Sequence, residues 1–109
     1  MVMIYFVQVG KNGPIKIGQS ETIHDKLAEL QVGCPWKLRL LFVYNGRDFS
    51  ESGLHEHFKD ENIRGEWFRP ARAIKEFNLY HPDDCYPINN FALNRCREDE
   101  QRIKFERKT

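Results

Sequence analysis

Two short apolar-rich runs separated by turn-forming residues constrain this chain more than any other feature. The runs are Met3–Val9 and Ile15–Ser20, and residues 10–14 between them read Gly-Lys-Asn-Gly-Pro. Glycine and asparagine tolerate positive φ, and proline fixes φ, so this segment predicts a loop between two paired strands. The rest of the fold must therefore be built around an N-terminal hairpin.

Alternation of side chains along these strands brings two polar groups toward one another. Ile15 and Ile17 share one face of the second run, which leaves Lys16 on the other face. Tyr5 and Phe6 are consecutive in the first run, so one of these aromatic rings faces away from the core. A phenol and an ammonium group can then meet on the polar side of the hairpin. The alternative is a half-buried tyrosine and a solvated lysine.

Length and composition indicate a globular protein with one real core. The chain has 109 residues, of which 40% are hydrophobic and 30% are charged. No apolar run approaches the ~20 residues of a membrane helix, and no secretory signal is visible, so we expect no membrane partner. The cysteines, Cys34, Cys85 and Cys96, are odd in number and widely spaced, which favours a reduced, cytoplasmic (intracellular) setting. The formal net charge of +1 means that a local basic patch would have to attract nucleic acid.

Helical spacing of apolar residues predicts a helix after the hairpin, and then a third strand. The helix follows Thr22, a residue type that caps helices, and Lys26 borders its apolar face. The residues of that face are Ile23, Leu27 and Leu30. The run Leu38–Tyr44 predicts a buried strand, which Asn45 and Gly46 end.

Two further helices are predicted before the chain changes character. The first begins at Asp48 or Ser50 and carries Leu54 and Phe58, and the second begins near Pro70. Ile74 and Phe77 should point inward from the second of these helices. We expect one domain over residues 1–80. Residues 81–109 form a charged C-terminal extension that is either helical or disordered, and a solvated terminus is the alternative to a partner-binding tail.

Two groups of residues suggest metal binding, and the first of them is a poor metal signature. His55 and His57 are two apart, so on a helix their imidazoles point in different directions and cannot easily hold one ion. Glu66 lies between a turn glycine and two aromatic residues, and its carboxylate could hold Mg²⁺. The alternative is a salt bridge from Glu66 to Arg64 or Arg69.

Five short motifs, in order, resemble those of the GIY-YIG nuclease superfamily. They are Ile4-Tyr5, Lys16-Ile17-Gly18, Leu27-x-x-Leu30-Gln31, Leu54-His55 and Gly65-Glu66-Trp67-Phe68. The chain looks most like the small phage and bacterial branch whose second motif reads Lys-Ile-Gly. The resemblance implies an α/β (α+β) domain with a central three-stranded antiparallel sheet flanked by helices. It also implies a metal-dependent DNA endonuclease with a single active site.

The resemblance implies a role for each matching residue. Tyr5 would help to deprotonate the attacking water, and Lys16 would favour tyrosinate or hold the nucleophile near the phosphate. Glu66 would be the one protein ligand to Mg²⁺ or Mn²⁺, and His55 would contact phosphate or relay a proton. Lys26 stands where the family carries its catalytic arginine, so it keeps the charge but loses the planar fork.

The replacement at Lys26 leaves a second hypothesis open. The chain is either an active endonuclease or a weak or inactive module of the same fold that binds nucleic acid or a protein partner. Three basic residues, Arg64, Arg69 and Arg72, are the expected nucleic-acid contacts. We expect DNA as the main partner, a possible protein contact through the C-terminal extension, and a monomer or weak homodimer.

Overall fold

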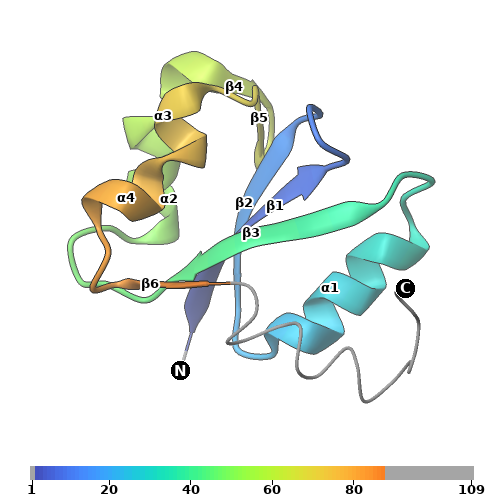
Figure 1. Ribbon diagram of the computed structural model, residues 1–109, viewed down its shortest axis with the longest axis horizontal. Coiled ribbons are helices and arrows are strands. Elements are labelled where there is room, and N and C mark those ends of the chain that lie inside the picture. Colours follow the sequence, from blue (N-terminus) through green and yellow to red (C-terminus); the bar gives the residue numbers. More distant parts are fainter. Residues whose placement is uncertain (1, 88–109) are drawn as a thin grey trace.

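The fold is a six-stranded antiparallel sheet with helices on both faces (Figure 1). The computed structural model describes residues 2–87. In spatial order the strands are β4 (Asn62–Arg64), β5 (Trp67–Phe68), β2 (Ile15–Ser20), β1 (Met3–Val9), β3 (Leu38–Tyr44) and β6 (Cys85–Pro87). The α+β class and the three central strands agree with the prediction. The three-stranded sheet was too small, because β4, β5 and β6 are too short to show a periodic pattern.

The hairpin of β1 and β2 forms where the sequence predicts it. Tyr5 pairs with Gly18, and Phe6 pairs with Ile17. Gly10 has a φ of +61°, a left-handed conformation that glycine adopts without steric cost. The loop is closed by backbone hydrogen bonds, including one from the Val9 N–H to the Pro14 carbonyl at 3.0 Å.

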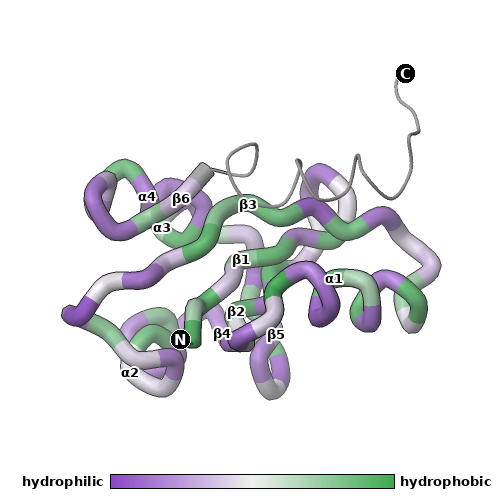
Figure 2. The backbone as a smooth tube through the Cα atoms, turned by 90° about the horizontal axis from the view of Figure 1, so that it is seen from below, coloured by the Kyte–Doolittle hydropathy of each residue, from purple (hydrophilic) through white to green (hydrophobic). Residues whose placement is uncertain are grey.

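Alternation along β1 divides the core into two clusters, one on each face of the sheet. Ile4 and Phe6 belong to the aromatic core, which helices in residues 51–80 cover, whereas Tyr5 and Val7 face the helix in residues 23–32. The aromatic core consists of Ile4, Phe6, Ile15, Ile17, Phe42, Tyr44, Leu54, Phe58, Phe68, Ile74 and Phe77. Figure 2 shows hydrophobic residues running along β1 and β3, in the middle of the sheet.

The helices are α1 (Ile23–Val32), α2 (Glu51–His57), α3 (Arg72–Lys75) and α4 (Phe77–Tyr80), with a 3₁₀ turn at Lys59–Glu61. Ser50 caps α2 as expected, since its side chain accepts a hydrogen bond from the Gly53 N–H at 3.0 Å. Thr22 precedes α1, but its side chain makes no capping bond. The single helix predicted after Pro70 is divided at Glu76 into α3 and α4.

The sheet continues past the domain end that was predicted near Tyr80. Strand β6 pairs with β3, and the Asn45 N–H donates to the Asp84 carbonyl at 2.8 Å. The division at residues 80 and 81 stays a prediction, and most of the C-terminal extension lies outside the described residues. Over residues 2–87, no helix has the length and apolar character needed to cross a membrane.

Phe77 is the side chain that joins α4 to the aromatic core, which makes it a sensitive test of this architecture. Its ring lies 5.5 Å from that of Phe6 and 5.3 Å from that of Tyr44, measured between centroids. We expect Phe77→Ala to lower the free energy of unfolding by about 3–5 kcal/mol, as measured by urea denaturation. Leu79→Ala on the same helix should change it by less than about 0.5 kcal/mol, because Leu79 is 65% exposed. Equal effects of the two variants would contradict the packing of α4.

Candidate active site

The peptide groups of Ile17 anchor the candidate site to the edge of β2. The Ile17 N–H donates to the carbonyl of Glu66 at 3.0 Å. The Ile17 carbonyl accepts a hydrogen bond of 2.8 Å from Nε2 of His55. Residues from β2, from helix α2 and from the β4–β5 turn are therefore tied to one point of the sheet. Because a carbonyl only accepts hydrogen bonds, Nε2 of His55 carries a proton, which leaves Nδ1 as the acceptor in the neutral ring.

The β4–β5 turn holds Glu66 by local geometry. Gly65 adopts a φ of +57°, which favours glycine at this position. The side-chain amide of Asn62 donates to the carbonyls of Gly65 at 2.9 Å and Trp67 at 3.2 Å. The carboxylate is thus presented by a tight, hydrogen-bonded turn.

Lys16 and Glu66 form an ion pair beside this edge. Nζ of Lys16 lies 2.9 Å from Oε1 of Glu66, and the two side chains are 15% and 41% exposed. The ammonium group also lies 5.3 Å from the centroid of the Trp67 ring, within cation–π range. Neither alternative weighed for these residues therefore holds: Lys16 is not a freely solvated lysine, and the partner of Glu66 is a lysine instead of an arginine.

Tyr5 reaches the same place because its cross-strand neighbour has no side chain. A Cβ added to Gly18 would lie 2.6 Å from Cζ of Tyr5 and 3.1 Å from Oε1 of Glu66. The phenol and the carboxylate therefore both pack against the backbone of Gly18. The absence of a side chain at Gly18 allows this approach, although its backbone angles are ordinary for a strand.

The environment of Tyr5 keeps its phenol protonated. Burial is the largest cause that raises the pKa of Tyr5 from 10.0 to about 12, and the negative charges of Glu66, Glu51 and Glu29 contribute to the same increase in that order of importance. This corrects the expectation that Lys16 favours tyrosinate, because burial and carboxylate repulsion dominate. At neutral pH the phenol therefore keeps the proton with which it can donate a hydrogen bond.

Glu51 is a site residue that the sequence prediction missed. It lies in the first turn of α2, four residues before His55, so the two side chains share one helix face. Burial raises the pKa of the Glu51 carboxyl, followed by the charge of Glu66, whose carboxyl is within hydrogen-bonding reach. Among the described residues, Oε2 of Glu51 is buried and has no hydrogen-bond partner. Its spacing to His55 was the available signal.

The two histidines of α2 point to different surroundings, as their spacing predicts. The ring of His55 packs edge-on against Phe68 at 5.1 Å, whereas that of His57 packs against Phe58 at 4.7 Å. His57 is exposed. Only His55 joins the candidate site.

The remaining predicted residues lie outside this cluster or on its margin. Lys26 faces Glu29 within α1, with Nζ and Oε1 3.9 Å apart, and its catalytic role stays a prediction. Arg64 is exposed on β4, beside the turn that holds Glu66. Nη1 of Arg69 donates to the Asp60 carbonyl at 3.0 Å. Nε of Arg72 is bonded to Glu76 at 2.9 Å, so part of its donor capacity is already used.

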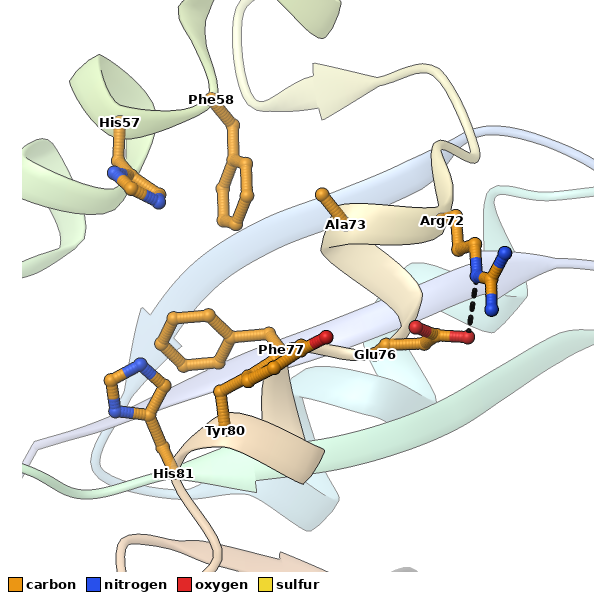
Figure 3. A pocket seen from close by; sticks show the side chains of 8 residues that line it. All are labelled: His57, Phe58, Arg72, Ala73, Glu76, Phe77, Tyr80 and His81. Atoms are coloured by element: carbon orange, nitrogen blue, oxygen red, sulfur yellow. Dashed lines mark hydrogen bonds and ion pairs between the residues drawn. The ribbon is translucent and has the colours of Figure 1, made fainter.

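Two other features of residues 2–87 are formed by residues outside the cluster around Ile17. Asp48, His81 and Asp84 place one potential metal-ligating atom each within 4.8 Å of the others. A pocket of about 420 Å³ lies between α2 and helices α3 and α4 (Figure 3). It is lined by His57, Phe58, Arg72, Ala73, Glu76, Phe77, Tyr80 and His81. Of the predicted site residues, it includes Arg72 alone.

Comparison with known families identifies the domain. The family model of the T5orf172 domain matches residues 2–85, which is most of the chain and all but the last residues of the described sheet.

The chain belongs to the T5orf172 domain family.

This family is nuclease-like and DNA-binding, which agrees at that coarse level with the expected partner and chemistry. Searches of curated proteins and of solved structures found no match. The predicted membership of the GIY-YIG superfamily is wrong, because the family that matches is a different one. Roles that rested on that resemblance alone, above all the arginine-like role of Lys26, lose their support. The cluster around Ile17 stands on its own contacts.

Gly18 offers a direct test of how the T5orf172 domain assembles this cluster. We expect Gly18→Ala to lower the free energy of unfolding by roughly 1–3 kcal/mol, because its methyl group would overlap the Tyr5 ring. Gly33→Ala is the matched control, since a Cβ there meets no atom within 4 Å. Urea denaturation of both variants measures the difference. A neutral Gly18→Ala would show that the Tyr5 ring does not depend on this space.

The raised pKa of Tyr5 predicts a measurable dependence of stability on pH. A group whose pKa is higher in the folded state stabilises fully below its unfolded pKa of 10.0, and this contribution is lost as pH rises toward about 12. At about 1.4 kcal/mol per pH unit, wild type should lose on the order of 2–3 kcal/mol more than Tyr5→Phe in this window. Urea denaturation between pH 8 and 12 measures it, and parallel curves throughout would contradict the assignment.

Proposed function

We propose that this T5orf172 domain hydrolyses DNA phosphodiester bonds at the cluster around Ile17, with a divalent cation. The observation that carries the proposal is the convergence of chemically complementary groups from β1, β2, α2 and the β4–β5 turn. A phenol (Tyr5), an ammonium (Lys16), an imidazole (His55) and a carboxylate (Glu66) meet at the edge of one strand. A structural role alone requires no such combination of groups.

Each side chain has a role that follows from its state in the structure. Lys16 supplies a positive charge for a phosphate oxygen, and its ammonium group is held over the ring of Trp67. Tyr5 donates a hydrogen bond to the phosphate or to the attacking water, because its raised pKa keeps the proton on the phenol. Nδ1 of His55 is the available proton acceptor, because Nε2 is held by the Ile17 carbonyl.

The residues present fit a hard divalent cation. Mg²⁺ and Mn²⁺ take oxygen ligands and are commonly held by one or two carboxylates together with substrate phosphates. Glu66 is partly exposed, and a buried oxygen of the neighbouring Glu51 lacks a partner among the described residues. When bound, such an ion supplies positive charge that stabilises the phosphate undergoing hydrolysis. Because carboxylate charge contributes to the high pKa of Tyr5, neutralising that charge lowers this pKa.

The surface next to the cluster suits a polyanion. Arg64 is exposed immediately before the Gly65 turn, and Arg69 follows β5 on the other side of it. Arginine and lysine contacts to backbone phosphates supply most sequence-independent DNA affinity. The formal net charge of +1 implies that DNA attraction is local to this face.

A plasmid-nicking assay tests the proposal. Wild type should nick supercoiled DNA with Mg²⁺ or Mn²⁺, and Glu66→Gln should reduce the rate by about 100-fold or more, the scale for a positioned catalytic group. Glu56→Gln is the matched control, because Glu56 is an exposed α2 glutamate that pairs with Lys59. If wild type and Glu66→Gln show the same background at saturating metal, hydrolysis is ruled out. DNA binding that weakens steeply with salt, without cleavage, would then identify a binding module.

A further inference from the structure

The carboxyl pair of Glu51 and Glu66 has an unbalanced arrangement of charge. Lys16 supplies one ammonium group to the two acids, and it lies 2.9 Å from Glu66. Two ionised carboxylates can only accept hydrogen bonds, so neither can satisfy the other. Oε2 of Glu51 is accordingly buried without a partner among the described residues. A buried carboxylate oxygen in this state destabilises the fold unless a proton or a cation compensates it.

We infer that Glu51 is a second carboxylate ligand of the divalent cation, acting together with Glu66. The inference rests on the proposed function, because the same ion serves both. Its geometric basis is the orphaned Oε2 atom of a carboxyl group that lies within hydrogen-bonding reach of the Glu66 carboxyl, at a place where His55 and Lys16 also converge. The pKa of the Glu51 carboxyl, raised by burial and then by Glu66, agrees with a position from which a cation would relieve repulsion.

The position of Glu51 on α2 explains how it reaches the cluster. It is the first residue of the helix, directly after the capping residue Ser50. His55, one turn later, is fixed to the Ile17 carbonyl, so the helix face that carries Glu51 is held toward β2. A first-turn glutamate usually interacts with the helix dipole at the surface. Here the raised pKa and the buried oxygen show that the carboxyl group is partly withdrawn from water.

Manganese binding in the absence of DNA tests the inference without relying on catalysis. Free Mn²⁺ is measured by electron paramagnetic resonance during titration of wild type, Glu51→Gln, Glu66→Gln and the control Glu56→Gln. We expect Glu51→Gln and Glu66→Gln each to weaken Mn²⁺ binding by about tenfold or more, the scale on which metal-site residues act. Glu56→Gln should bind as wild type does, since Glu56 is paired with Lys59 on the surface.

Thermal unfolding separates a ligand from a structural residue. Without metal, Glu51→Gln should unfold at the wild-type temperature or above it, because the substitution removes one of two negative charges that repel each other. With saturating Mn²⁺, the increase in unfolding temperature seen for wild type should shrink in this variant. A variant that is less stable without metal, and that keeps the full increase with Mn²⁺, would assign Glu51 a structural role and overturn the inference.

The outcomes for the two proposals are distinct. If Glu51→Gln binds Mn²⁺ within about twofold of wild type while Glu66→Gln loses both binding and nicking, the second-ligand inference fails and the proposed function stands. If wild type neither binds Mn²⁺ nor nicks DNA, both proposals fail. If wild type nicks DNA with metal but Glu51→Gln loses Mn²⁺ affinity and nicking together, both are supported.

Discussion

The outward-facing peptide groups of Ile17 are the constraint on which the site depends. Buried backbone N–H and C=O groups require partners, and strand β5 is only two residues long, so it ends before it can satisfy β2 along its length. The turn carbonyl of Glu66 and the imidazole of His55 take the place of a continuing strand. The satisfaction of one strand edge therefore fixes two of the catalytic candidates.

The electrostatics of the cluster follow from the two hydrogen bonds made by the peptide groups of Ile17. Bringing α2 and the β4–β5 turn to the same strand places Glu51 and Glu66 close together, and Lys16 is the neighbouring positive charge. The repulsion is transmitted to Tyr5, whose pKa rises through burial first and through these carboxylates second. The cluster thus keeps its phenol neutral and brings two carboxyl groups together. The cation of the proposed function would offset the carboxylate charge that contributes to the raised pKa values of Tyr5 and Glu51.

Sequence patterns predicted the centre of this structure well and its edges poorly. The bounds of β1, β2 and β3 follow from short apolar-rich runs that turn-forming residues end, and the core positions of Leu54 and Phe77 follow from helical spacing. Strands of two or three residues carry no period, so β4 and β5 could not be predicted from the same signal. Glu51 was missed because a first-turn glutamate is ordinary at a helix start.

Family resemblance and physical contact made different contributions to the prediction of the site. The motif comparison selected Tyr5, Lys16, His55 and Glu66, which the structure brings together, but it named the wrong family, and the role that it gave Lys26 stays a prediction. Short motifs record which residue types occur in order, whereas only a fold brings them into contact. The contacts within the cluster are therefore stronger evidence for a functional site than the motif resemblance is.

The strength of the ion pair between Lys16 and Glu66 determines whether it blocks the site or prepares it. The Glu66 side chain is 41% exposed and that of Lys16 is 15% exposed, and ion pairs that stay in contact with water contribute about 1 kcal/mol or less. A charge-assisted hydrogen bond from the ammonium to a phosphate oxygen is worth about as much or more, at roughly 1.5–3 kcal/mol. Exchanging the partner of Lys16 from carboxylate to phosphate is thus energetically accessible. The ion pair positions the ammonium of Lys16 and the carboxylate of Glu66 next to each other, and it is weak enough for either group to bind a substrate instead.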